Sequence, residues 1–240
     1  MSASRHHRDV LTAALLFIGF IGWIAGLVNA LPDPGFAGHF AAVFAAALLS
    51  AVVGCRTLAG LGVGEVAIAA AVTVLIVIGV ATEMREAPVE PLRFAAIPVA
   101  VVGAIAGMWR RPRAPSPRST WLTLAAGAAG FGVTFLAVGV AMLVDADAAE
   151  VGVLPGAAAG AIASTLLFEH ARARHAAIGQ ALVYATALVA QEVSLETLGG
   201  GLAIGLLAGG LGGWLGCVLR ARLASRRGLP TARVEERDRV

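Results

Sequence analysis

Long apolar runs dominate the chain and are separated by short polar segments. One helix needs about 20 predominantly apolar residues to cross the roughly 30 Å hydrocarbon core of a bilayer. Most of the runs approach or exceed that length. The pattern therefore predicts eight membrane-crossing segments, which are Val10–Leu31, Phe36–Cys55, Leu58–Ala81, Leu92–Trp109, Trp121–Val144, Val151–Phe168, Ala176–Ala190 and Leu198–Leu219.

We expect these segments to be α-helices. Backbone polar groups inside a bilayer must bond within a helix or a closed barrel. Barrel strands alternate apolar and polar residues over about ten positions, whereas these runs are longer and apolar on all sides. The fold class is therefore all-α, a polytopic transmembrane helix bundle. The shortest segment, Ala176–Ala190, is expected to borrow residues up to Ser194 or to lie among other helices rather than against lipid.

Polar stretches divide the chain into two halves of four helices each. Prolines stiffen several of the connecting loops, among them Pro112, Pro115 and Pro117 before the fifth helix. The predicted divisions are a leader at 1–9, a first half at 10–109, an Arg- and Pro-rich loop at 110–120, a second half at 121–219 and a disordered basic tail at 220–240.

The distribution of arginine predicts the orientation. All 18 basic residues are Arg. All except Arg85 and Arg93 lie in the leader, in the tail or in loops predicted on the same side of the membrane as the two termini. Cytoplasmic loops are enriched in basic residues, so we expect both termini in the cytoplasm and the chain in a prokaryotic plasma (inner) membrane. The run Val10–Leu31 exceeds the roughly 7–15 residues of a signal-peptide core, which favours an uncleaved first helix.

Composition excludes a soluble protein. Hydrophobic residues make up 58% of the chain and charged residues only 14%, against roughly 25% charged in soluble domains. The net charge of +3 comes from arginines in short loops, which is an orientation signal rather than a nucleic-acid surface. We expect the lipid bilayer as partner and no nucleic acid.

The two halves have similar spacing, which suggests a parallel 4+4 internal repeat. Arg8 and Arg118 open the halves, and Arg110 and Arg220 close them, each pair 110 residues apart. Glu65 would then correspond to Gln180, after a short insertion. Chance similarity within an alanine-rich chain is an equally good explanation.

Glycines four residues apart lie on one face of a helix. Small residues of this kind let helices approach closely in lipid. Compact packing within the chain, a homo-oligomer through the Gly faces of helices 6 and 8, and a groove along a conduit are all consistent with them. Pro98 and Pro155 predict kinks in helices 4 and 6. The glycines are Gly152, Gly156 and Gly160 in the sixth helix and Gly201, Gly205, Gly209 and Gly213 in the eighth.

Four polar residues form the candidate transport site. Glu65 is the one formal charge well inside an apolar run, and a charge at bilayer depth is a functional hypothesis by default. It would bind a proton or a cation, unless the membrane begins near Gly62 and lets Glu65 reach the interface. Gln180 and Tyr184 share a helix face, and Thr186 lies two residues further on. These three bond to other helices or contact a substrate.

No catalytic or cofactor motif is present. The chain lacks Gly-x-Ser-x-Gly, His-Glu-x-x-His and a phosphate-binding loop. Its histidines lie near predicted helix ends, and Cys55 and Cys217 belong to no Cys-x-x-Cys pair. We expect no metal, no cofactor and no enzymatic activity.

Two functions fit these observations. The first is a permease for a small solute or ion, proton-coupled through Glu65, in which Glu65, Gln180 and Tyr184 face one central cavity. The alternative is a non-catalytic membrane subunit or scaffold, which predicts a dry, closed bundle with Glu65 at the headgroups.

Overall fold

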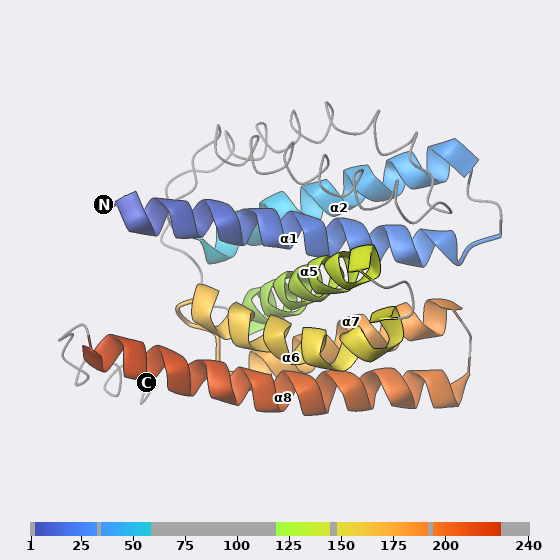
Figure 1. Ribbon diagram of the computed structural model, residues 1–240. Coiled ribbons are helices and arrows are strands. Elements are labelled where there is room, and N and C mark those ends of the chain that lie inside the picture. Colours follow the sequence, from blue (N-terminus) through green and yellow to red (C-terminus); the bar gives the residue numbers. More distant parts are fainter. Residues whose placement is uncertain (1–2, 33–34, 59–118, 145–147, 192–193, 227–240) are drawn as a thin grey trace.

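A computed structural model of the chain describes residues 3–32, 35–58, 119–144, 148–191 and 194–226. Within these residues the structure has six α-helices and no strand (Figure 1). They are α1 (Ala3–Asn29), α2 (Gly35–Thr57), α5 (Ser119–Val144), α6 (Ala148–Leu167), α7 (Ala173–Gln191) and α8 (Leu195–Arg226). The predicted third and fourth helices beyond Leu58, the loop 110–118 and Glu65 lie outside the described residues.

The observed helices begin and end close to the predicted segments, except that α1 begins at Ala3 rather than Val10 and that α8 is longer than predicted. That helix has 32 residues, so it is about 48 Å long at 1.5 Å per residue. It continues to Arg226 through the first part of the predicted tail. Because the hydrocarbon core is only about 30 Å thick, the arginine-bearing end of α8 extends past the apolar layer.

Among the described helices, four are long and apolar enough to cross a membrane. Their apolar stretches are His7–Val28, Gly35–Gly54, Ser119–Val140 and Leu195–Arg226, and α6 adds the shorter stretch Val153–Leu167. Although α6 contains Pro155, it remains one helix from Ala148 to Leu167. The prediction of a helical membrane protein is therefore confirmed.

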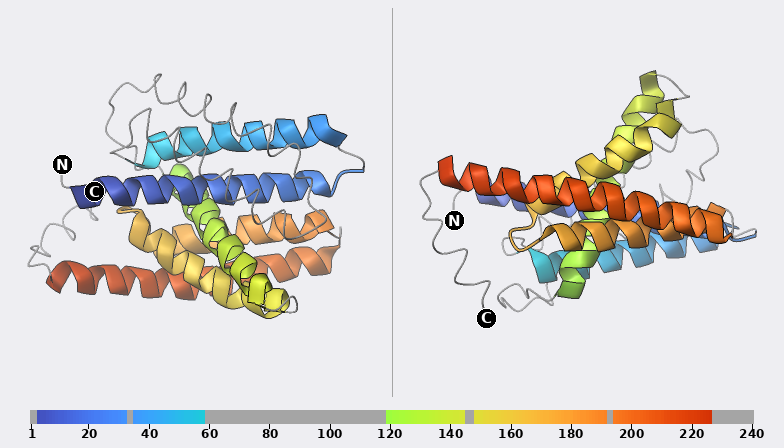
Figure 2. Two further views of the ribbon diagram at one scale, coloured as in Figure 1. Left: turned by 45° about the horizontal axis from the view of Figure 1, so that its top comes forward. Right: turned by 90° about the horizontal axis from the view of Figure 1, so that it is seen from below.

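Successive described helices alternate in direction. The beginning of α1 and the end of α8 lie at the same end of the bundle, called here the arginine-rich end (Figure 1). Helices α1, α2, α7 and α8 run alongside one another, while α5 and α6 cross them obliquely as an antiparallel pair (Figure 2). Helix α5 is central, since it packs against α1, α2, α6 and α7.

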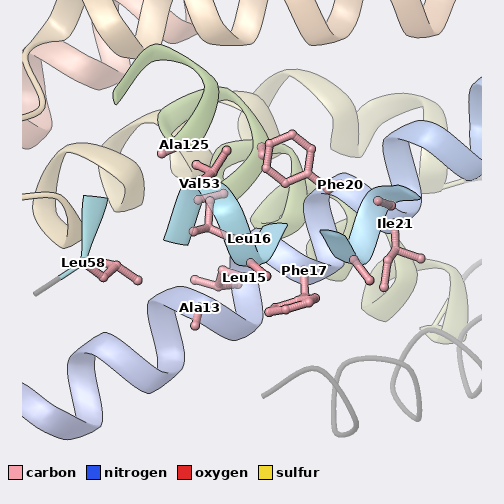
Figure 3. Close-up of a cluster of buried hydrophobic side chains, with 14 of the residues drawn as sticks. Ala13, Leu15, Leu16, Phe17, Phe20, Ile21, Val53, Leu58 and Ala125 are labelled. Carbon is pink, nitrogen blue, oxygen red and sulfur yellow. The ribbon is translucent and has the colours of Figure 1, made fainter. Parts of the chain in front are cut away.

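One hydrophobic core joins α1, α2 and α5. The α1 side chains Leu16, Phe17 and Phe20 are almost fully buried, and Val53 of α2 and Ala125 of α5 meet them (Figure 3). The cluster combines these large side chains with alanines of α2 and α5 such as Ala46, Ala47 and Ala128. Such a mixture of large and small residues lets the helices pack closely. This core holds α1 and α2 against the central helix α5.

The second half of the bundle packs through glycine instead. The glycine face of α8, formed by Gly201, Gly205, Gly209 and Gly213, lies directly on α7. Gly212 and Gly216 of the same helix lie on α6. The glycine faces are thus occupied within one chain by α7 and α6, and a homo-oligomer through them stays a prediction.

The opposite face of α8 is apolar and exposed. Leu207, Leu211, Trp214 and Leu215 all expose more than 40% of their surface. Lipid tails are the natural solvent for such a face. Helix α7 exposes a face that includes Ile178 and Leu182, and it packs mainly against α8 and α5, with smaller contacts to α6 and α1.

Candidate functional site

The described part of the predicted polar site lies where four helices meet. Gln180 of α7 is fully buried. Its amide nitrogen lies against Gly130 of α5, and its Cβ lies beside Gly209 of α8. Gly160 of α6 contacts the backbone of Gly130 directly. One side chain therefore fills the space between four closely packed helices.

Glycine is required around this crossing for a steric reason. A Cβ on Gly130 would overlap the Gln180 amide, and a Cβ on Gly160 would overlap the carbonyl oxygen of Gly130. The α5–α7 contact is similar, since a Cβ on Gly127 would come within 2.6 Å of the carbonyl oxygen of Gly179. Backbone atoms cannot rotate away as a flexible side chain can, so the helices approach only because these positions lack a Cβ.

Tyr184 lies one turn from Gln180 and bonds to α5. Its hydroxyl donates to Thr134 Oγ1 over 2.8 Å, and Thr134 Oγ1 donates to the carbonyl oxygen of Gly130 over 3.0 Å. Phe131 packs edge-on against the tyrosine ring, with the ring centroids 5.9 Å apart. This arrangement ties α7 to α5 and gives the buried hydroxyl groups partners, as buried polar groups require.

Thr186 faces a different helix. The indole nitrogen of Trp23 on α1 donates to Thr186 Oγ1 over 2.9 Å. The threonine hydroxyl in turn donates to the carbonyl oxygen of Leu182 over 2.8 Å. The structure thus brings Gln180 and Tyr184 together at the α5–α7 contact and directs Thr186 to α1.

The Gln180 amide makes no hydrogen bond. Both its nitrogen and its oxygen are buried without a partner. An unpartnered buried polar group destabilises a protein by about 1–3 kcal/mol. Among the candidate-site residues that the structure describes, Gln180 is therefore the one whose side-chain polar atoms have no hydrogen-bond partner on the surrounding helices.

The pattern of charges did not reveal the role of Arg220. Its guanidinium donates over 2.9–3.0 Å to four backbone carbonyl oxygens, those of Thr165, Phe168, Glu169 and Ala171. The last carbonyls of a helix have no partner within the helix, and a cation is favourable at this negative end. Arg220 of α8 therefore caps the end of α6.

His175 joins the beginnings of α5 and α7. Its Nδ1 accepts from the backbone N–H of Arg172 over 2.9 Å, so the proton of the neutral ring lies on Nε2, which reaches Ser119 Oγ over 3.2 Å. The ring lies just before the apolar run of α7. Burial, followed by the charges of Arg174 and Arg172, lowers the pKa of His175 below 6.5. Sequence reasoning passed over this histidine because it lies at a helix end.

This geometry predicts a loss of stability in acid. Because the folded-state pKa lies below the unfolded value of 6.5, His175 stabilises the fold fully above pH 6.5 and loses that effect as the pH falls through the folded-state pKa. Unfolding midpoints in neutral detergent should therefore fall between pH 7.5 and 5.5. His175→Gln should remove this part of the pH dependence, whereas the same change at the exposed His170 should leave it intact. An unchanged slope in His175→Gln would contradict the assignment.

Within the described helices and turns, no three His, Cys, Asp or Glu side chains gather as a metal site would require. The Cys217 thiol is free and lies 4.0 Å from the carbonyl oxygen of Ala171, beside the Arg220 cap. These contacts hold helix ends together.

The fold and this polar crossing define a multi-pass α-helical membrane protein. Residues 116–177 match the family model described as "Cyanobacterial TRADD-N associated 2-Transmembrane domain". That segment is about a quarter of the chain and contains α5, α6 and the first turn of α7. The two long helices of the match are therefore the oblique pair of Figure 2. No curated protein and no solved structure matches the chain.

Proposed function

We propose that the protein is a non-catalytic membrane scaffold, a closed helix bundle that holds a partner at the membrane. The observation that carries this proposal is the close contact of helix backbones at glycine. Gly130 meets Gly160, Gly127 meets Gly179, and Gly205 lies on Ala181. Contacts of this kind favour a rigid bundle, because small residues let helix backbones pack directly against one another.

The polar side chains also favour a structural role. Tyr184 and Trp23 both donate to threonine hydroxyls on neighbouring helices. In a membrane such bonds hold helices together. The hydrogen-bonding capacity of these groups is thus used for packing rather than directed towards a solute.

The description of the matched family supports the same proposal. It names a two-transmembrane domain by its association with TRADD-N. A membrane pair that is defined by the domain it accompanies fits an anchoring role. In this chain α5 begins and α6 ends at the arginine-rich end (Figure 1), so a partner held by this pair would lie on that side.

Transport is the second candidate, and Gln180 is the observation that favours it. An unpartnered amide at a crossing of four helices could contact a passing solute or ion. In this alternative Glu65 binds the coupling proton. Transport would require the α5–α7 contact to open, since Gly127 and Gly179 touch through their backbones.

We also infer that the arginine-rich end faces the cytoplasm of a prokaryotic cell, with the chain in the plasma membrane. Arg8, Arg56, Arg174, Arg222 and Arg226 all lie near helix termini at this end. Positive residues concentrate on the cytoplasmic side of membrane helices, which supports this orientation for both termini.

Flux through reconstituted protein separates the two functions. The full chain is placed in vesicles of phosphatidylethanolamine and phosphatidylglycerol, and urea and glycerol entry is followed by stopped-flow light scattering. Proton entry is followed with trapped pyranine under an imposed membrane potential. Gln180→Leu serves as the matched variant, because it keeps a similar volume and removes the unpartnered amide. If the protein is a scaffold, vesicles that contain the wild type or Gln180→Leu should be no more permeable than protein-free vesicles.

A further inference from the structure

We propose that the arginine-rich ends of α7 and α8 each bind anionic phospholipid, with one headgroup phosphate at Arg174 of α7 and another at Arg222 and Arg226 of α8. This proposal rests on the membrane location of the chain and not on the scaffold function. It concerns the outer surface of the bundle, away from the polar crossing at Gln180.

The first observation is an exposed stripe on α7. Leu182, Ile178 and Arg174 are spaced by four residues and so share one helix face. All three are exposed, with Ile178 exposing 54% and Leu182 42% of their surface. The stripe is apolar in the middle of α7 and ends in a guanidinium at the beginning of the helix, at the arginine-rich end.

The second observation is a matching stripe on α8. Leu207, Leu211 and Leu215 follow one another at intervals of four, and Arg222 lies seven residues after Leu215 on the same face. These leucines expose 66%, 69% and 41% of their surface. Arg226, one turn beyond Arg222, is also exposed. An apolar ridge again leads into cationic side chains.

Charge at this end is strongly unbalanced. Among the described residues, the acidic side chains at the arginine-rich end are Asp9, which is 4% exposed beside Arg8, and Glu169. Arg220 is engaged with the carbonyl oxygens at the end of α6 and does not contribute to the stripes. The positive N-terminal dipole of α7 adds to the field at Arg174.

A phospholipid fits both parts of each stripe. Its acyl chains would cover the leucine ridge, and its phosphate would accept hydrogen bonds from the guanidinium groups, which match phosphate geometry well. An acidic protein would satisfy the arginines but would leave the ridges below them without a partner. An anionic lipid at each stripe therefore accounts for the apolar and the basic residues of that stripe together.

The test measures lipid binding to purified protein in dodecylmaltoside. Native mass spectrometry counts bound palmitoyl-oleoyl phosphatidylglycerol, and thermal unfolding reports its stabilising effect. Phosphatidylglycerol should bind and raise the unfolding midpoint, whereas phosphatidylcholine should do so at least tenfold more weakly, a ratio that corresponds to about 1.4 kcal/mol. High salt should weaken the effect, because screening reduces these interactions.

Variants and a soluble ligand locate the site. Arg174→Gln should lower the affinity of the α7 stripe, and Arg222→Gln and Arg226→Gln should each lower the affinity of the α8 stripe, roughly fivefold in each case, as expected for about one charge at a membrane surface. Glu196→Gln, at the opposite end of α8, should bind like the wild type. All four positions are exposed, so the variants should keep the wild-type unfolding midpoint without lipid. Glycerol phosphate has no acyl chain and should not stabilise the protein.

Two results would overturn the proposal. The first is equal binding of phosphatidylglycerol by the wild type and by the variant that combines all three Arg→Gln changes. This result would show that these arginines do not hold the headgroup, and would favour an acidic protein as their partner. Equal stabilisation by glycerol phosphate would identify a free phosphate site instead of a lipid site.

Discussion

Gly205→Ala should destabilise the protein by roughly 3 kcal/mol, which is at the upper end of the usual effect of overpacking. A Cβ at this position would overlap the backbone of Ala181. Backbone atoms of α7 can give way only if the whole helix moves. That movement would also disturb Gln180 and the α5–α7 contact, because Gly127 and Gly179 touch on the other side of α7.

A glycine on the same helix provides the control. Gly200 has no atom within 4 Å of the position that a Cβ would occupy. Gly200→Ala should leave stability unchanged or raise it by up to about 1 kcal/mol, since alanine favours a helix over glycine. Equilibrium unfolding in mixed dodecylmaltoside and SDS micelles measures both variants. Equal effects of the two changes would mean that α8 does not pack on α7 through its glycine face.

Arg220→Met should destabilise the protein by about 3 kcal/mol. The change leaves the carbonyl oxygens of Thr165, Phe168, Glu169 and Ala171 without the donor that now reaches all four. Hydrogen bonds to a charged group contribute about 1.5–3 kcal/mol each, and hydration of the freed carbonyls offsets part of that loss. Arg220→Lys should recover only part of it, because an ammonium group cannot span four acceptors as a guanidinium does.

The control for this prediction is Arg226→Met on the same helix. Arg226 is exposed and forms none of the bonds that cap α6. In neutral micelles its loss should change the free energy of unfolding by less than about 0.5 kcal/mol, as is usual for surface positions. If Arg220→Met changed the free energy of unfolding as little as Arg226→Met, the cap would contribute nothing to stability. Arg220 would then serve only as a positive charge that sets the orientation of the chain in the membrane.

The positions of the described helices could be predicted because apolar run length is a direct consequence of bilayer thickness. The glycine spacing also predicted which face of α8 packs. It could not predict that α7 covers that face, since alanine is frequent in every apolar run and identifies no particular partner. The pairing depends on Ala181 and Ala185 lying at the same level as Gly205 and Gly201.

The candidate site was predictable only in part. The four-residue interval correctly indicated that Gln180 and Tyr184 share a buried face. Thr134, which receives the Tyr184 hydrogen bond, is 50 residues away in sequence, and no local pattern connects the two. The hydrogen bond between Trp23 and Thr186 likewise joins residues that are distant in sequence. Glu65 lies outside the described residues, so its depth and its proposed role remain predictions.

Arg220 and His175 show what charge counting leaves out. Counting arginines predicts a side of the membrane, but it does not distinguish an arginine that caps a neighbouring helix from one that is exposed. Arg220 and Arg222 are two residues apart, and only Arg220 points at the end of α6. The rotation of α8 that decides this is fixed by its glycine contacts with α6 and α7, which form only in the folded bundle.

The permeability of the reconstituted wild-type protein tests the scaffold account most directly. The account predicts that urea, glycerol and protons enter vesicles containing the protein at the same rates as protein-free vesicles, and that Gln180→Leu changes none of these rates. A faster rate with the wild type that returns to the protein-free value in Gln180→Leu would contradict the scaffold account. It would make the crossing of α5, α6, α7 and α8 at Gln180 part of a transport path.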